Sequence, residues 1–124
     1  MSMVVIGSKQ DSLWHSTLRE AFAPLGAVDI IAMEDVCVKE LSGRYEIVAV
    51  DAAHVKNVEE LVSRLRRARP EQRIVVMTAS PTWQRARAAF EAGAADYLPK
   101  KLSKAELFKS FSKVRRKQPP PWPR

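Results

Sequence analysis

Short apolar runs alternate with segments of helical periodicity along most of this chain. Five runs have the length and composition of buried strands, at residues 4–6, 28–31, 47–50, 74–77 and 95–98. Four of the five are followed by a polar residue, glycine or proline, and short runs of this kind are typical of strands that are covered on both faces. The pattern therefore predicts five strands in the interior of one sheet.

Helical segments are predicted between these strands and after the last one. They start near Ser12, Glu34, Val58, Pro81 and Ser103, and proline or glycine follows most of them. Apolar residues spaced three and four apart mark the faces expected to be buried. These are Leu13, Trp14, Leu18 and Phe22; Val58, Leu61, Val62 and Leu65; Ala86, Ala89 and Phe90; and Leu107, Phe108, Phe111 and Val114. Arg64, Arg66 and Arg67 are expected to face water.

Strands that alternate with helices indicate an α/β protein whose parallel sheet is covered on both faces. Five such units favour a flavodoxin-like three-layer sandwich with strand order 2-1-3-4-5. We expect one domain over residues 1–117, followed by a proline-rich tail or linker at residues 118–124. The tail holds four of the eight prolines.

The composition is that of an ordinary globular chain. It has 124 residues, of which 46% are hydrophobic and 28% charged. No apolar run approaches the ~20 residues that span a bilayer, and no secretory signal is visible. The single cysteine, Cys37, has no partner for an internal disulfide. These features predict a cytoplasmic protein in which Cys37 is a small buried residue.

The formal net charge of +7 is concentrated at the C-terminal end. From Lys100 onward there are nine lysines and arginines and one acid, Glu106, so the rest of the chain is close to neutral. Three interpretations of this basic last helix stay open. It is a solvated face, a surface for an acidic protein or for a second copy, or a nucleic-acid contact.

Polar side chains follow three of the predicted strands. Asp51 ends the run at 47–50, Thr78 ends the run at 74–77, and Lys100 follows the last strand. The carboxyl ends of parallel strands meet at one edge of such a sheet, so these side chains are expected to converge. A carboxylate, a hydroxyl and an ammonium suit a phosphoryl group, with Asp51 as the nucleophile. The alternative is that Asp51 caps the following loop.

The sequence at these places resembles the receiver domain of bacterial two-component response regulators, over residues 3–117. The segment GAADYLPK at 93–100 matches the family's G-A-x-D-Y-L-x-K signature. The segments VMTA at 76–79 and YEIVAVD at 45–51 match its V-x-T-A and Y-D-L-V-x-x-D motifs. The resemblance implies that Asp51 is the phospho-acceptor, that Thr78 and Lys100 sense the phosphate, and that Tyr97 is an aromatic switch.

The resemblance also implies a non-enzymatic signalling module. Its expected partners are a histidine kinase or a downstream signalling protein. A homodimer through the fourth helix, fifth strand and fifth helix is a further expectation. Nucleic acid is a less favoured partner, and no membrane insertion is expected.

The chain departs from the family at the metal site. The family places two adjacent acids after the first strand, whereas this chain has Gly7 and Ser8 or, in the other register, Lys9 and Gln10. Asp11 is the nearest acid and is well placed as a helix N-cap. Mg²⁺ prefers carboxylate oxygens, so Asp51 and Asp11 are weak metal candidates. We expect no cofactor, with Mg²⁺ required only if the phosphorylation site works.

The sequence therefore favours an atypical receiver, or pseudo-receiver, that acts through protein contacts with weak or no phosphorylation at Asp51. One alternative is a working, Mg²⁺-dependent phospho-accepting receiver. An alternative of a different class is a flavodoxin-like module that binds a nucleotide or nucleic acid through the basic last helix. His54 is interpreted as a plain loop residue, and His15 as a surface or boundary residue of the first helix.

Overall fold

Five parallel strands form one sheet in the order β2-β1-β3-β4-β5, which confirms the predicted topology. A computed structural model describes residues 2–10, 12–41 and 43–116 of the chain. The strands are β1 (Ser2–Gly7), β2 (Ala27–Ala32), β3 (Ile47–Asp51), β4 (Arg73–Thr78) and β5 (Asp96–Pro99). Asp11 and the predicted tail at 118–124 lie outside the described residues.

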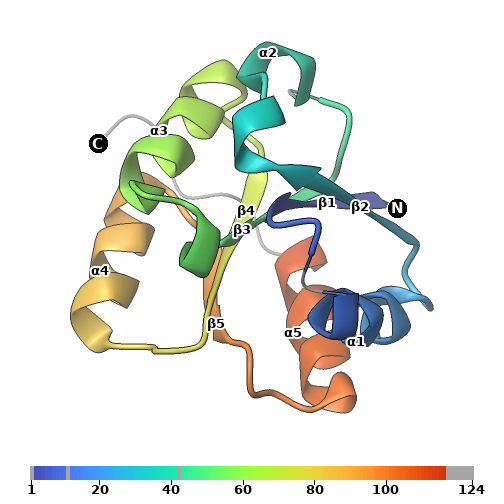
Figure 1. The fold of residues 1–124 in the computed structure, drawn as a ribbon. Coiled ribbons are helices and arrows are strands. Elements are labelled where there is room, and N and C mark those ends of the chain that lie inside the picture. Colours follow the sequence, from blue (N-terminus) through green and yellow to red (C-terminus); the bar gives the residue numbers. More distant parts are fainter. Residues whose placement is uncertain (1, 11, 42, 117–124) are drawn as a thin grey trace.

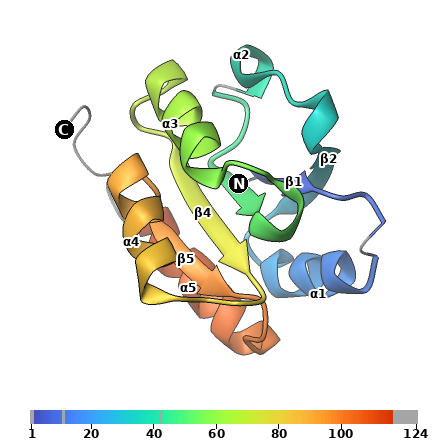
Figure 2. The ribbon, with the colours of Figure 1, turned by 60° about the vertical axis from the view of Figure 1, so that its left-hand side comes forward.

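The helices form a layer on each side of the sheet (Figures 1 and 2). They are α1 (Ser12–Phe22), α2 (Val38–Leu41), α3 (Val58–Ala68), α4 (Trp83–Ala92) and α5 (Lys104–Arg116). Two short 3₁₀ helices, η1 (Met33–Asp35) and η2 (Ala52–His54), follow β2 and β3. None of the helices in the described part of the chain has the length and apolar character needed to cross a bilayer.

Each layer has its own apolar core. On the α1 and α5 side, Phe22 and Phe111 pack edge to face with ring centroids 5.4 Å apart. On the other side, Leu61, Val62 and Leu65 of α3 pack against the sheet. The central strand β3 is buried along its whole length. It therefore carries Asp51 into an interior position at its carboxyl end.

Capping residues close by in the sequence stabilise the ends of α4 and α5. Thr82 caps α4, since its hydroxyl accepts a hydrogen bond from the Arg85 N–H at 3.2 Å. Gly93 ends α4 in the left-handed conformation at φ 118°. Ser103 and Glu106 bond reciprocally to each other's backbone N–H at the start of α5, as in a capping box. The start of α5 next to Ser103 is as predicted, whereas α4 begins at Trp83, two residues after the predicted Pro81.

The predicted helix from Glu34 to Leu41 is the one element that is largely wrong. The chain instead forms the single 3₁₀ turn η1, an extended residue at Val36, and the one-turn helix α2. β-branched Val36 and Val38 lose side-chain freedom in a helix, which weakens any continuous helix here. Cys37, expected to be buried, is exposed in this interrupted segment.

Several predicted burial states are also wrong. Leu13 is 81% exposed, and Phe90 and Phe108 are 44% and 37% exposed. Each lies on a helix flank next to the stripe that contacts the sheet. His15 is buried instead of lying at the surface, because α1 turns it inward together with Leu18. Periodicity located the helices but not the rotation at which each of them packs.

Arg66 was expected in water and is instead 1% exposed. Its Nη1 donates a hydrogen bond of 2.8 Å to the carbonyl of Gly93 at the end of α4. Burial lowers the pKa of its guanidinium. A Cβ on Gly93 would approach the Arg66 Cγ to 2.9 Å, so glycine makes room for this side chain. Arg66 thus ties α3 to the C-terminal end of α4.

Replacing Arg66 with methionine should lower the free energy of unfolding by about 1–3 kcal/mol, because the Gly93 carbonyl loses a buried donor. Urea unfolding measures this loss. The matched control is Arg67→Met on the same helix, since Arg67 is exposed and should change stability by less than about 0.5 kcal/mol. Equal losses in the two variants would contradict the structural role assigned to Arg66.

Candidate functional site

The predicted site residues lie where β3, β4 and β5 end. Asp51 is the last residue of β3 and is 1% exposed. Thr78 is the last residue of β4, and Lys100 follows β5. The backbone N–H of Lys100 donates to the Thr78 carbonyl at 2.8 Å, which continues the β4–β5 ladder past the strand end. The parallel sheet thus brings together residues that are far apart in the sequence.

Lys100 and Asp51 are in direct contact. The Lys100 Nζ lies 2.8 Å from the Oδ1 and 2.8 Å from the Oδ2 of Asp51. The carboxylate also accepts a hydrogen bond of 3.1 Å from the backbone N–H of Ala53 in η2. Both oxygens therefore have donors within the protein. The ammonium neutralises the carboxylate without a bound ion.

The indole ring of Trp14 in α1 packs against the Lys100 ammonium of this ion pair. The Lys100 Nζ lies 5.5 Å from the centroid of the indole, within the range of a cation–π contact. Trp14 is 9% exposed, and its indole N–H has no hydrogen-bond partner among the described residues. The sequence placed Trp14 in a core stripe and gave no sign of this contact. The packing of α1 beside the end of β5 creates it.

Thr78 is buried beside the ion pair. Its Oγ1 accepts a hydrogen bond of 3.1 Å from the backbone N–H of Ser80, which shapes the loop after β4. Asp51 is paired in the sheet with Met77, so Thr78 stands one residue beyond Asp51 along the strand direction. The hydroxyl hydrogen remains available to an acceptor above the strand ends. This position suits the phosphate contact expected of Thr78.

Tyr97 lies on β5 opposite Val76 and packs into the apolar layer on the α3 and α4 side. Its hydroxyl is buried and has no hydrogen-bond partner in the described part of the chain. The ring lines a hollow of about 250 Å³ with Val58 of α3 and Ala89 of α4. Tyr97 is therefore turned inward.

Among the described residues, the surroundings of Asp51 offer few of the carboxylate ligands that Mg²⁺ prefers, and Asp11 lies outside these residues. Gly7, one of the two places where the receiver pattern has acids, is so close that a Cβ there would lie 2.9 Å from the Asp51 Cβ. Ser8 uses its Oγ to accept from the Gln10 N–H. Among the described residues no three His, Cys, Asp or Glu side chains are grouped as metal ligands. Lys100 already engages the Asp51 carboxylate.

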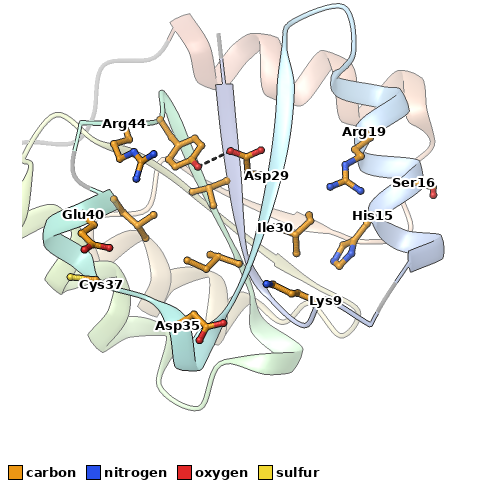
Figure 3. A pocket seen from close by; sticks show the side chains of 14 residues that line it. Lys9, His15, Ser16, Arg19, Asp29, Ile30, Asp35, Cys37, Glu40 and Arg44 are labelled. Atoms are coloured by element: carbon orange, nitrogen blue, oxygen red, sulfur yellow. Dashed lines mark hydrogen bonds between the residues drawn. The ribbon is translucent and has the colours of Figure 1, made fainter.

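A larger hollow is at a different edge of the molecule. It measures about 780 Å³ and lies along the outer edge of β2, between α1 and the η1–α2 segment (Figure 3). His15 and Cys37, which the sequence left without a role, both line it. His54 lies away from it and is exposed. The strand-end site and this hollow are therefore separate features.

Comparison with known proteins is informative at the level of the fold. No protein-family model matches the chain, and no curated protein sequence matches it. Solved structures match over nearly its whole length. An orphan response regulator of Helicobacter pylori superposes with a TM-score of 0.74 at 22% identity, covering 93% of this chain and 97% of its own.

Two further solved structures extend this likeness. The signal receiver domain of the response regulator NarL of Mycobacterium tuberculosis has a TM-score of 0.75 at 17% identity, over 94% of this chain and 97% of its own. A Burkholderia pseudomallei response regulator with a phosphorylated aspartic acid has a TM-score of 0.67 at 20% identity. It is matched over 93% of this chain and 66% of its own. The chain has the fold of response-regulator receiver domains.

Removing one member of the ion pair should destabilise the fold more than removing both. Asp51→Asn and Lys100→Met each leave a partner without its counter-charge, and each should cost roughly 3 kcal/mol of unfolding free energy. The double variant removes both charges and should recover at least half of that loss. Urea unfolding of the four proteins provides the comparison. Additive losses would show that the two side chains stabilise the fold independently.

Trp14 should be energetically coupled to Lys100. In a double-mutant cycle of Trp14→Leu and Lys100→Met, the coupling free energy should be about 0.5–2 kcal/mol. Trp14→Phe keeps an aromatic face and should retain part of the coupling. Trp83→Leu, at an exposed tryptophan of α4, is the control and should show no coupling with Lys100→Met.

Proposed function

We propose that this chain is a receiver domain of the response-regulator type that signals through protein contacts, with weak or no phosphorylation at Asp51. The fold and the three strand-end residues support the receiver assignment. The observation that carries the atypical part is that Gly7 packs against Asp51 where the receiver pattern has an acid, so that Lys100 supplies the charge in contact with the carboxylate. Such a pocket is charge-neutral before any phosphoryl group arrives.

Phosphoryl transfer to Asp51 would face two physical obstacles. The attacking carboxylate oxygen would first have to lose its contact with Lys100. The negative charge that develops during transfer would then need neutralisation, which Mg²⁺ ordinarily supplies. Gly7 offers no side-chain ligand for this ion, and a Cβ there would lie only 2.9 Å from the Asp51 Cβ. Both effects favour a slow or absent reaction, in a domain that we propose is not an enzyme.

The surface proposed for partner contact includes the outer flank of α4. Trp83 is 69% exposed and Phe90 44% exposed, and seven positions separate them, so they lie on the same side of the helix. Arg85 and Ala89 line the hollow shared with α3. Helix geometry then turns Trp83 and Phe90 away from this hollow, to another side of α4.

The charge of α5 indicates what kind of partner this surface would bind. Its exposed residues include Lys109, Lys113 and Arg115, and the one acid of the helix, Glu106, is engaged by Ser103. A partner with acidic groups around an apolar anchor would complement the apolar flank of α4 and the bases of α5. The expected partner is a histidine kinase or a downstream signalling protein. Binding of a second copy through this surface would be opposed by repulsion between the basic residues of the two α5 helices.

Incubation with acetyl phosphate and Mg²⁺, followed by intact mass measurement, tests the proposal. We expect less than about a tenth of the chain to gain the mass of a phosphoryl group, because the metal that stabilises the transition state is poorly held. The Asp51→Asn protein gives the background. A phosphorylated species in most of the wild-type protein, absent from Asp51→Asn, would establish the working Mg²⁺-dependent receiver instead.

A further inference from the structure

The outer edge of β2 is open. Among the described strands β2 pairs with β1 alone, over the six positions from Ser2 and Ala27 to Gly7 and Ala32. On an edge strand of a parallel sheet, alternate residues turn their N–H and C=O groups away from the neighbouring strand. Five of the six residues of β2 are apolar. A strand of this kind offers backbone hydrogen bonds to any extended segment laid beside it.

A groove with oppositely charged walls surrounds this edge (Figure 3). The wall on the α1 side carries Lys9 and Arg19, which we call the basic wall. The wall on the η1–α2 side carries Asp35 and Glu40, which we call the acidic wall. Arg44 closes one end of the acidic wall. The two sets of charges face opposite sides of the β2 edge.

The groove exists because α2 is a single turn, Val38–Leu41, that leaves part of the β2 face uncovered. Ile30 and Ile31, on opposite faces of β2, are half-buried and form an apolar floor. The Asp29 carboxylate is occupied by the Tyr45 hydroxyl at 2.7 Å, a contact that also raises the pKa of Tyr45. Asp29 keeps its negative charge in this contact, so Asp29 and Arg44 contribute to the field of the groove together with the charges of the two walls.

Arg19 already makes one contact to the edge strand. Its Nε donates a long hydrogen bond of 3.4 Å to the Val28 carbonyl. An acidic side chain of an incoming strand would offer this guanidinium a stronger, charge-assisted partner. The exchange would free the Val28 carbonyl for a backbone N–H. Arg19 thus covers the edge in the absence of a ligand and can contact the ligand when one is present.

We propose that this groove binds an extended segment of a partner protein, which adds to β2 as a sixth strand. Side chains of a strand alternate between the two faces of the sheet. The segment would therefore carry acidic residues at alternate positions, facing Lys9 and Arg19, and basic residues at the intervening positions, facing Asp35 and Glu40. Backbone hydrogen bonds supply the affinity, and the charge alternation supplies the specificity.

Charge argues against a second copy of this chain as the occupant. Two β2 edges that pair in antiparallel fashion are related by a two-fold axis perpendicular to the sheet, so each helix layer meets the same layer of its partner. Lys9 and Arg19 would then face their own counterparts, and Asp35 and Glu40 theirs. Like charges placed opposite each other are destabilising. A different chain with the alternating pattern avoids this repulsion.

This proposal goes beyond the proposed function, since it concerns the edge of the sheet opposite β5 and needs no chemistry at Asp51. The probe is the peptide acetyl-Glu-Lys-Val-Val-Glu-Lys-amide, in which glutamates lie on one face and lysines on the other. The comparison peptide, acetyl-Glu-Glu-Val-Val-Lys-Lys-amide, has the same composition but mixes both charges on each face. Titration into ¹⁵N-labelled full chain, followed by amide NMR shifts, measures both affinities.

We expect the first peptide to bind with Kd on the order of 1 mM or tighter, with the largest shifts in β2 and α1. It should bind about tenfold more tightly than the mixed peptide, the effect expected from two or more favourable charge pairs. The backbone nitrogens of the peptide can be methylated either at its odd or at its even positions. Only one of these two sets of N–H groups faces β2, so methylating that set should abolish binding and methylating the other set should leave it unchanged. Charge attraction alone would not distinguish the two sets.

Reversing the charge of the basic wall by mutation of the protein provides a matched test. Lys9→Glu with Arg19→Glu should weaken binding of the first peptide by about tenfold or more. Replacing the peptide's two glutamates with lysines should restore binding to this variant. Lys109→Glu with Lys113→Glu changes the same number of charges on α5 and should leave peptide affinity within about twofold.

Three results would overturn the proposal. The first is the absence of saturable shifts in β2, and the second is equal affinity for the two peptides. The third is concentration-dependent self-association that broadens the β2 amides, since this would make a second copy the occupant of the edge. These outcomes do not depend on phosphorylation of Asp51. If the peptide fails to bind, the proposed function is unaffected, and if the proposed function is wrong, the proposal for the β2 edge is unaffected.

Discussion

The ion pair between Asp51 and Lys100 is the interaction on which the interpretation of this molecule depends. Asp51 lies at the end of a strand that is buried on both faces, where an uncompensated carboxylate would be strongly unfavourable. The fold brings the Lys100 ammonium within 2.8 Å of both carboxylate oxygens, and the Trp14 ring lies over the cation. Gly7 packs against the same carboxylate residue, since a Cβ at this position would lie 2.9 Å from the Asp51 Cβ.

A second constraint acts at the opposite side of the sheet. The segment after β2 fails to make a full helix, and the short α2 leaves an open strand edge in a groove with oppositely charged walls. Natural proteins usually protect such an edge with charge, coverage or pairing. Here Arg19 covers one carbonyl and the remaining edge is accessible. The open edge and the strand-end ion pair are thus separate features of the same sheet.

Much of the fold could be predicted, because it follows from local patterns. The five apolar runs, the N-cap at Ser103 and the C-cap at Gly93 each depend on residues a few positions apart. Asp51, Thr78 and Lys100 could be assigned to one edge because the direction of parallel strands fixes where their carboxyl ends meet. The errors concern helix rotation and packing between elements. Leu13 is exposed, whereas His15 and Arg66 are buried. Arg66 is the clearest case, since its burial depends on a glycine carbonyl 27 positions away.

The sequence by itself determined the order of strands and helices, the candidate residues at the strand ends, and the lack of an acid pair after β1. These depend on periodicity and on residue identity, which are local. The tertiary structure alone decided that Lys100 contacts both oxygens of Asp51, that Trp14 lies over the ammonium, and that Tyr97 is turned inward. It also decided that α2 leaves the β2 edge open between two charged walls. Such facts depend on how separate elements pack against one another, because distances between them are set by the whole core.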